Sequence, residues 1–582
     1  MSEQPDRAGD PLQQAVRLAA EIGDKVNGAK ATLALADWHL AKGERDKARG
    51  MYGRALEQSL AVHLPEVTWR AHKGLASVAR QNGDIPTARA EIDKALLVVE
   101  DLRGAIKVEE LKNGFIANKL DLYDDAIQLA LDFPQPGQDP ALIAWTYSER
   151  SRARSFIDLL ANRKISLSSK EDTRRIDEQR ALKDRIFAAE DMLAKAPAAD
   201  KPARAKELSD LRETYRDMLV EIRAANPKLS AFVTVEPPTL PEVRKILAKD
   251  SGLLEYHVAS KETLVWTITD TSMRVTRLPI GRDKLATMVH DYKSKMEAIR
   301  PVDAEAKVLF TLLVEPAIGA DLKGKRFLGI APHGSLHYVP FAALRDGNDY
   351  LIDRYALFYV PSAAVLPLTA GAATMATSDR SKARVLAIGN PDLGDPSFAL
   401  PFAEIEVQEL KLDFEQIDVL TRERATDRWV ANNLGNYHVI HFACHGEFDP
   451  VNPLFSSLRL AREQGDAKPG ADGALRAHDI FGIPLKAELV TLSACQTGLG
   501  KIEAGDELIG LNRAFLYAGT RSIMSTLWRV HDGSTAVLVK HFYRSYTQEP
   551  KADALRTSMR QVREYYPHPA YWAAFALTGE YR

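Results

Sequence analysis

A cysteine and a histidine follow two apolar segments in the second half of the chain. His445 comes shortly after the segment Tyr437–Ala443, and Cys495 comes shortly after Glu488–Ser493. If these segments are neighbouring parallel strands, both side chains face the crevice at the carboxyl edge of one sheet. A thiolate can attack a carbonyl carbon, an imidazole can move the proton, and backbone N–H groups can hold the oxyanion. The pair predicts nucleophilic acyl transfer by Cys495 and His445, with the N–H groups of Gly446 and Cys495 as the oxyanion hole.

Three competing interpretations of nearby residues are weaker. His438 and His441 precede Cys444 and His445 as in some metal sites, but on a strand these two histidines point to opposite faces. A phosphate-binding loop ending at 498–502 would need Gly at 495, where Cys stands, and Ser or Thr at 502, where Ile stands. Ser335 lies between two histidines without a G-x-S-x-G elbow, so we expect a turn there. We therefore expect neither a metal nor a cofactor.

The elements that position Cys495 and His445 alternate between strand and helix patterns after residue 236. Short apolar segments rich in β-branched and aromatic residues indicate strands of a mostly parallel sheet flanked by helices. They span 252–258, 263–269, 326–332, 384–390, 437–443, 487–494 and 521–528. The sequence therefore predicts an α/β domain whose site lies beyond the carboxyl ends of its strands.

The N-terminal region is repetitive. The pattern Gly43-x4-Ala48-x3-Tyr52-x2-Ala55 recurs 40 residues later as Gly83-x4-Ala88-x3-Ile92-x2-Ala95. Small residues at fixed places let two helices approach closely, and a glycine ends the first of them. The pattern resembles tetratricopeptide repeats lengthened to 40 residues, although a plain helical bundle remains an alternative. A further helix is expected over 141–160, and a charged antiparallel helical hairpin over 168–228.

Composition excludes several classes of function. The chain has 582 residues, a formal net charge of −2 and 2 cysteines. A near-neutral chain has no bulk attraction for nucleic acid, and so few cysteines indicate a reducing compartment. The polar start carries no signal-peptide apolar core. The uncharged stretch 355–378 is interrupted by Pro361 and Pro367, which favours a buried strand and a loop over a membrane span. We expect a cytoplasmic protein without direct nucleic-acid or membrane partners.

Several motifs together resemble one known family. HFACHGEFD, LSACQTGLG, GDELIGLNRAFLYAGTRSIMSTLWRVHD and HPAYWAAFALTGE occur in order, with APHGSLHYVPFAAL, LPFAEIEVQEL and ERSRARSFIDLL upstream. They are similar to the CHAT family, the caspase-like domain associated with tetratricopeptide repeats. The resemblance covers about residues 240–582. It implies a cysteine peptidase fold of the caspase or separase type, with His445 as base and Cys495 as nucleophile.

The resemblance also implies substrate-binding residues. TLWRVHD resembles the strand end that lines the cleft in separases and caspases, so the backbone at Ser525 would pair with an extended peptide and Trp528 would wall a pocket. Asp532 resembles the acidic residue that receives an arginine in separases, although His531 departs from the usual pattern and a loop cap is the alternative. Asp506 is either a substrate-binding residue or the N-cap of the following helix.

These observations predict an α + α/β protein in three parts. We expect a tetratricopeptide-like region at 1–165, a helical hairpin linker at 166–235, and a caspase-like domain at 236–582. The resemblance implies a pseudo-catalytic half at 236–380 and a catalytic half at 381–582. The predicted function is a cysteine endopeptidase that cleaves a specific protein and is controlled by a protein partner on the repeats, and the family analogy suggests bacterial defence or cell death. The alternative is an interaction scaffold without catalysis.

Overall fold

The computed structural model describes most of the chain as two compact units. It describes residues 8–105, 119–152, 239–369, 377–447, 456–463, 472–493 and 511–582, with isolated residues between 178 and 218. The first unit comprises Met1–Ser151 and Lys164–Glu236, and the second comprises Arg152–Arg163 and Pro237–Arg582. Most of the predicted hairpin at 168–228 and the second half of the predicted helix at 141–160 lie outside the described residues.

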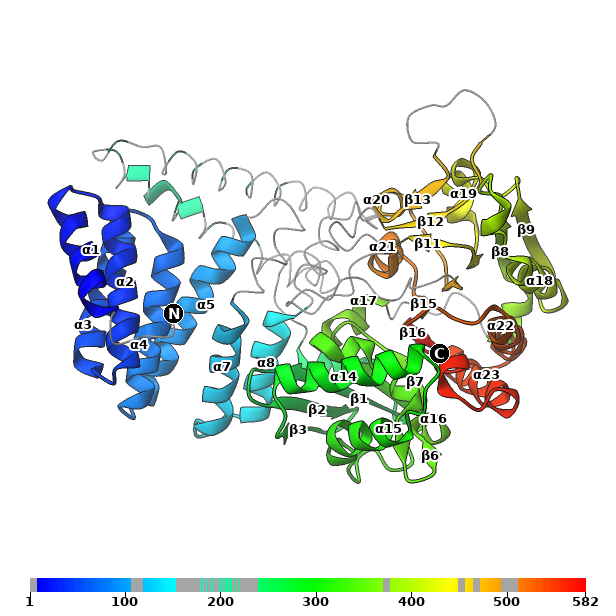
Figure 1. Cartoon of the computed structure of the whole chain (residues 1–582), viewed down its shortest axis with the longest axis horizontal. Coiled ribbons are helices and arrows are strands. Elements are labelled where there is room, and N and C mark those ends of the chain that lie inside the picture. The colour runs from blue at the N-terminus through cyan, green and yellow to red at the C-terminus, as the bar shows by residue number, and fades with distance from the viewer. Residues whose placement is uncertain are drawn as a thin grey trace. The chain divides into compact units, whose positions relative to one another are not determined.

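The first unit is built from helices that pack side by side with their sequence neighbours (Figure 1). Short turns join the first five of these helices, which therefore run antiparallel to their sequence neighbours. The helices are α1 (Gly9–Glu21), α2 (Lys25–Ala41), α3 (Arg45–Ala61), α4 (Pro65–Gln81), α5 (Ile85–Ala105), α7 (Leu120–Asp132) and α8 (Pro140–Ser151). The prediction of N-terminal helical repeats is confirmed.

The turns of this unit recur every 20 residues. Gly23, Gly43, His63 and Gly83 have positive φ angles of 71°, 75°, 53° and 79°, and each stands in the turn between two helices. A residue in the left-handed region just beyond a helix satisfies the last carbonyl groups, and glycine takes this conformation without strain. The 40-residue repeat therefore consists of two 20-residue halves, each a helix and its turn.

Close helix packing in the repeats depends on small residues. Ala36, Ala48 and Ala55 are fully buried between neighbouring helices. The Tyr52 ring of α3 lies against Gly74 of α4, where an added Cβ would be 2.2 Å from a ring carbon. The repeat pattern in the sequence thus marks the contact face of each helix pair.

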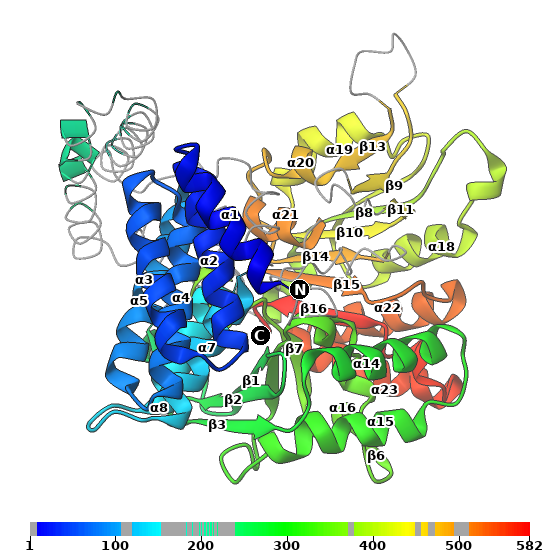
Figure 2. The ribbon, with the colours of Figure 1, turned by 60° about the vertical axis from the view of Figure 1, so that its left-hand side comes forward.

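The second unit is organised around one sheet of 11 strands, in the order β3-β2-β1-β4-β7-β16-β15-β14-β10-β8-β9 (Figure 2). Small β ladders lie outside it: β11, β12 and β13 form one, and β5 and β6 another. The strands are β1 (Ser251–Val258), β2 (Thr263–Thr269), β3 (Met273–Leu278), β4 (Phe327–Ala331), β5 (Arg345–Asp346), β6 (Asp349–Tyr350), β7 (Ala356–Tyr359), β8 (Arg384–Pro391), β9 (Gln416–Arg422), β10 (Val439–Ala443), β11 (Gly446–Glu447), β12 (Ser457–Arg459), β13 (Ala474–Arg476), β14 (Leu489–Leu492), β15 (Ser522–Thr526) and β16 (Phe575–Gly579).

The two halves of the sheet run in opposite directions. Strands β1, β4 and β7 are parallel to one another, and so are β15, β14, β10, β8 and β9. Strand β16 lies between these groups, parallel to β7 and antiparallel to β15. The carboxyl ends of the two groups therefore lie at opposite edges of the sheet. The predicted mostly parallel sheet is confirmed.

Helices cover both faces of this sheet. His441 of β10 points to the face covered by α18 and α22, and its neighbour Phe442 points to the face covered by α21. The helices are α13 (Leu240–Ile246), α14 (Arg282–Glu297), α15 (Asp303–Leu309), α16 (Leu351–Arg354), α17 (Leu366–Thr369), α18 (Pro401–Glu409), α19 (Asp427–Asn433), α20 (Ala477–Ile480), α21 (Leu511–Ala518), α22 (Asp532–Tyr546) and α23 (Lys551–Tyr565). Within the described parts of the chain, none of the helices combines the length and the apolar character that a membrane crossing requires.

Candidate functional site

The strands that lead into His445 and Cys495 are parallel neighbours. Strand β10 pairs with β14 in a register that joins residues 50 apart, such as Phe442 with Leu492. His445 and Cys495 have the same separation in the sequence. Cys495 and Asp506 lie outside the described residues. The structure therefore confirms that the two strands are adjacent, as the sequence analysis required.

The His445 imidazole is held by a backbone carbonyl. His445 is half-buried at the carboxyl end of β10, and its Nε2 lies 2.8 Å from the carbonyl oxygen of Phe398. The Phe398 ring meets the imidazole edge-on at 5.7 Å between centroids. A carbonyl oxygen only accepts, so Nε2 must carry the hydrogen and donate it. In the neutral ring, Nδ1 is then the acceptor, as a general base requires.

The backbone around His445 is fixed by a small ladder. Gly446 and Glu447 form β11, which pairs antiparallel with β12, and the carbonyl of His445 accepts a hydrogen bond of 2.8 Å from the N–H of Arg459. Cys444, the preceding residue, is buried. The backbone of His445 thus lies between β10 of the large sheet and β11 of the small ladder, and both strands hold it in place.

A buried polar network lies beneath the same strand end. His441 Nε2 is 2.9 Å from Glu406 Oε1 of α18, and its Nδ1 is 3.2 Å from the Tyr543 hydroxyl of α22. Tyr543 donates to Thr491 of β14 at 2.8 Å. Burial raises the pKa of the Tyr543 phenol, so it stays protonated. The network joins two strands and two helices, and both ring nitrogens of His441 have partners in it. His438 instead accepts a hydrogen bond from the N–H of Arg384.

Ser525 and Trp528 are buried at the end of β15. Ser525 pairs with Leu492 on one side and with Ala576 on the other, and its Oγ accepts from Asn512 at 2.9 Å. Trp528 donates its indole N–H to the carbonyl of Ala570 at 3.1 Å. The backbone of Ser525 has no free edge, so the expected addition of a peptide strand at this residue is wrong.

Asp532 is exposed in the first turn of α22. His531 is the N-cap, and its Nδ1 faces the N–H of Ser534 at 3.5 Å. A carboxylate in the first turn of a 15-residue helix is stabilised by the helix dipole. The carboxylate of Asp532 remains accessible to solvent, and hence to a cationic side chain.

The opposite edge of the sheet carries a different cluster. His333 follows β4, and its Nδ1 accepts a hydrogen bond from the N–H of Val258. Ser335 lies in the short 3-10 helix Gly334–Tyr338, which agrees with the turn expected there. Arg152, from the ERSRARSFIDLL segment, is fully buried and pairs with Glu255 of β1 at 3.1 Å. This arginine is structural: it also donates to the carbonyl oxygen of Tyr256 at 2.8 Å.

Comparison with known proteins identifies the domain that holds this site. Residues 303–580 match the CHAT domain family. This part of the chain is a CHAT domain. The resemblance inferred from HFACHGEFD, LSACQTGLG and the accompanying motifs is thereby confirmed.

Two curated relatives share part of the sequence. The chain is 29% identical over 323 residues to mouse Tetratricopeptide repeat protein 28, and 27% identical over the same length to the human protein. Each alignment covers 47% of this chain but only 13% of the relative. Two chains of Saccharomyces cerevisiae separase–securin complexes match with a TM-score of 0.38 and 11% identity, covering 98% and 96% of this chain and 53% and 50% of theirs.

Proposed function

We propose that the chain is a cysteine endopeptidase that cleaves a specific protein, with Cys495 as nucleophile and His445 as base. The observation that carries the proposal is the His445 imidazole at the carboxyl end of β10, beside the strand that leads into Cys495. Its Nε2 is bound to the Phe398 carbonyl, which leaves Nδ1 to accept a proton. In this proposal residues 381–582 are the catalytic half and 236–380 the pseudo-catalytic half.

The reaction proceeds in two balanced steps. His445 Nδ1 takes the thiol proton of Cys495, the thiolate attacks the peptide carbonyl, and backbone N–H groups of Gly446 and Cys495 hold the oxyanion. The C–N bond breaks as His445 returns the proton to the departing amine, leaving a thioester. Water, deprotonated by His445, then attacks the thioester, and the acid product and thiol are released.

Apolar surface beside His445 supports a protein substrate. Helix α18 buries Glu406 and leaves Phe402 and Ile405 half-exposed, with exposed fractions of 50% and 52%, and Phe398 is equally open. Because the Phe398 ring contacts His445, this surface continues into the site. We assign it to contact with apolar side chains of the substrate, and Asp532 to a cationic one.

The test compares site variants in one assay. Cys495→Ala should abolish cleavage, and His445→Gln should lower kcat about 10²- to 10⁴-fold. Labelling by a thiol-reactive peptide electrophile should be lost in Cys495→Ala and slowed in His445→Gln. Cleavage that persists undiminished in Cys495→Ala would refute the proposal, and a chain that neither cleaves nor labels would be the interaction scaffold.

The helical repeats would control this activity. Helical-repeat surfaces bind protein partners, and a partner that prefers the competent state shifts the population toward it. Cleavage of the substrate by the full chain should therefore rise when the partner is added. Equal activity with and without every partner recovered on the first unit would contradict this control.

A further inference from the structure

Asn390 has an unusual backbone conformation at the carboxyl end of β8. Its φ is +49°, although it is not glycine and it precedes Pro391. The left-handed region costs a non-glycine residue free energy, and a following proline restricts the backbone toward extended conformations. The side chain is buried, with 4% exposed. Surrounding contacts must therefore hold Asn390 in place.

Those contacts are two hydrogen bonds that close the loop 391–400. The side-chain oxygen of Asn390 accepts from the N–H of Leu400 at 2.7 Å, and its amide nitrogen donates to Glu404 Oε2 at 3.0 Å. Leu400 is the N-cap of α18, and Glu404 lies in the first turn of that helix. The amide thus fixes the end of the loop to the end of the strand where the loop begins.

The loop contains internal hydrogen bonds. Asp395 accepts a hydrogen bond from the N–H of Ser397 at 2.8 Å, and the carbonyl of Asp395 accepts from the N–H of Phe398 at 3.1 Å. The carbonyl of Phe398 lies two residues before Leu400 and accepts from His445 Nε2 at 2.8 Å. A hydrogen-bonded turn that is held at its end by Asn390 restricts the direction of this carbonyl.

We infer that Asn390 is a positioning residue for His445, an inference that rests on the proposed function. Through Leu400 and the turn, it sets the Phe398 carbonyl, and that carbonyl fixes the ring orientation and tautomer of His445. Outer partners of metal-binding histidines influence metal affinity or activity by about 10- to 100-fold, and we expect an effect of that size here. Loss of the clamp should lower kcat in that range.

The test uses variants that separate strain from hydrogen bonding. Asn390→Gly removes both hydrogen bonds but accepts the positive φ without strain. Ile299→Gly is the matched control, because Ile299 also has a positive φ, +52°, in the turn after α14. The double variant Asn390→Asp with Glu404→Gln restores the second hydrogen bond in the opposite direction. We expect a lower kcat and a shifted acid limb of the pH–rate profile in Asn390→Gly, recovery in the double variant, and wild-type kinetics in Ile299→Gly.

A second readout does not depend on peptidase activity. In histidine-labelled protein, ¹⁵N NMR reports which ring nitrogen carries the hydrogen, and the His445 signal is assigned by its loss in His445→Gln. In the Cys495→Ala background, Asn390→Gly should convert one tautomer of His445 into a mixture. An unchanged His445 spectrum would overturn the inference, whereas absent cleavage with a changed spectrum would count only against the peptidase proposal.

Discussion

At the scale of single residues, Gly389 determines how closely α18 approaches the sheet. A Cβ at this position would lie 2.5 Å from Val407 Cγ2 and 2.6 Å from the carbonyl oxygen of Ala403. The carbonyl belongs to the helix backbone and cannot rotate away, so Gly389→Ala must displace α18. We expect a loss of about 1–3 kcal/mol in the free energy of unfolding of the second unit, measured by urea denaturation.

A second glycine of the same unit gives the control. An added Cβ at Gly482 would meet the carbonyl oxygen of Asp479 at 3.5 Å, an ordinary contact, so Gly482→Ala should change stability by less than about 0.5 kcal/mol. Equal urea midpoints for Gly389→Ala and Gly482→Ala would show that α18 is not held against β8 as described.

The residue types of the proposed pair were visible in the sequence, but the partner of the imidazole was not. His445 is hydrogen-bonded to the backbone carbonyl of Phe398. The path of the loop 391–400 decides which residue supplies this carbonyl. Every residue has a carbonyl oxygen, so the sequence does not indicate which one will bind the imidazole. The Asn390-Pro391 dipeptide at the end of the predicted strand 384–390 was the available signal of a special turn, since both residue types are common in turns.

At the scale of elements, buried strands were predictable and edge strands were not. All seven strands predicted from apolar segments are present, and β1, β2, β4, β10, β14 and β15 are buried throughout. Strands β3 and β9 were missed because they lie at the two edges of the sheet and alternate with charged residues such as Arg274 and Asp418. Strand β16 was missed because its short apolar run was recognised only as a family motif.

The 40-residue helical repeat was predicted, but its division into two 20-residue halves was not. Glycines at 43 and 83 revealed the 40-residue spacing, whereas the intermediate turn carries His63 in the same left-handed conformation. A histidine there bears strain that a glycine would not. The backbone conformation recurs at every turn, but the glycine does not. The 20-residue half is therefore visible only in the structure.

The same repeats allow a matched pair of glycine substitutions. Gly74→Ala would place a Cβ 2.2 Å from the Tyr52 ring, which is buried and hydrogen-bonded to Asp37. We expect a loss of about 1–3 kcal/mol from overpacking. Gly53→Ala, on the exposed side of α3 with open space around it, should instead gain about 0.5–1 kcal/mol of helix stability. Thermal unfolding of the first unit measures both, and shifts of the same sign would contradict this packing.

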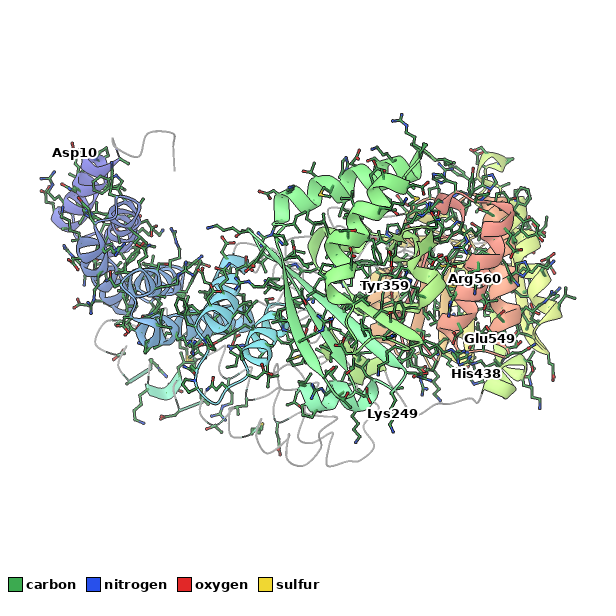
Figure 3. All side chains as sticks on the ribbon, turned by 90° about the horizontal axis from the view of Figure 1, so that it is seen from below. Asp10, Lys249, Tyr359, His438, Glu549 and Arg560 are labelled. Atoms are coloured by element: carbon green, nitrogen blue, oxygen red, sulfur yellow. The ribbon has the colours of Figure 1, made fainter. Side chains whose placement is uncertain are left out.

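At the scale of the whole second unit, Asp353 links α16 to the last helix. Arg563 of α23 donates to both of its carboxylate oxygens at 2.8 and 2.9 Å, and Arg560, labelled in Figure 3, lies 3.6 Å away. Burial alone would raise the pKa of Asp353, but the hydrogen bonds from Arg563 and from the N–H of Tyr350 outweigh it and lower the pKa below 3.8. The ionised carboxylate therefore stabilises the fold.

The sign of this pKa shift fixes the pH dependence. Because the folded pKa is lower than the unfolded one, the stabilisation is complete well above pH 3.8 and is lost as the pH falls below it. Asp353→Asn should cost about 2 kcal/mol at pH 7, and the difference from wild type should shrink in urea denaturation series taken down to pH 3. A difference that stays constant with pH would show that Asp353 does not stabilise as a carboxylate.

The position of β16 makes the two halves of the sheet interdependent. This strand comes from the C-terminal end of the chain yet lies between β7 of the first half and β15 of the second. Leu577 of β16 is fully buried and pairs with Met524. An aspartate there would bury a charge without a partner, so Leu577→Asp should cost about 4 kcal/mol or more.

Hydrogen exchange can show whether that cost reaches both halves. If the sheet unfolds as one unit, Leu577→Asp should reduce amide protection in β1 and β4 as much as in β10 and β14, whereas Tyr565→Asp, at a side chain that is 72% exposed, should change neither. Loss of protection confined to residues after 380 would mean that the first half folds on its own. The boundary proposed at residue 380 would then separate two folding units, and the continuous sheet would be only their junction.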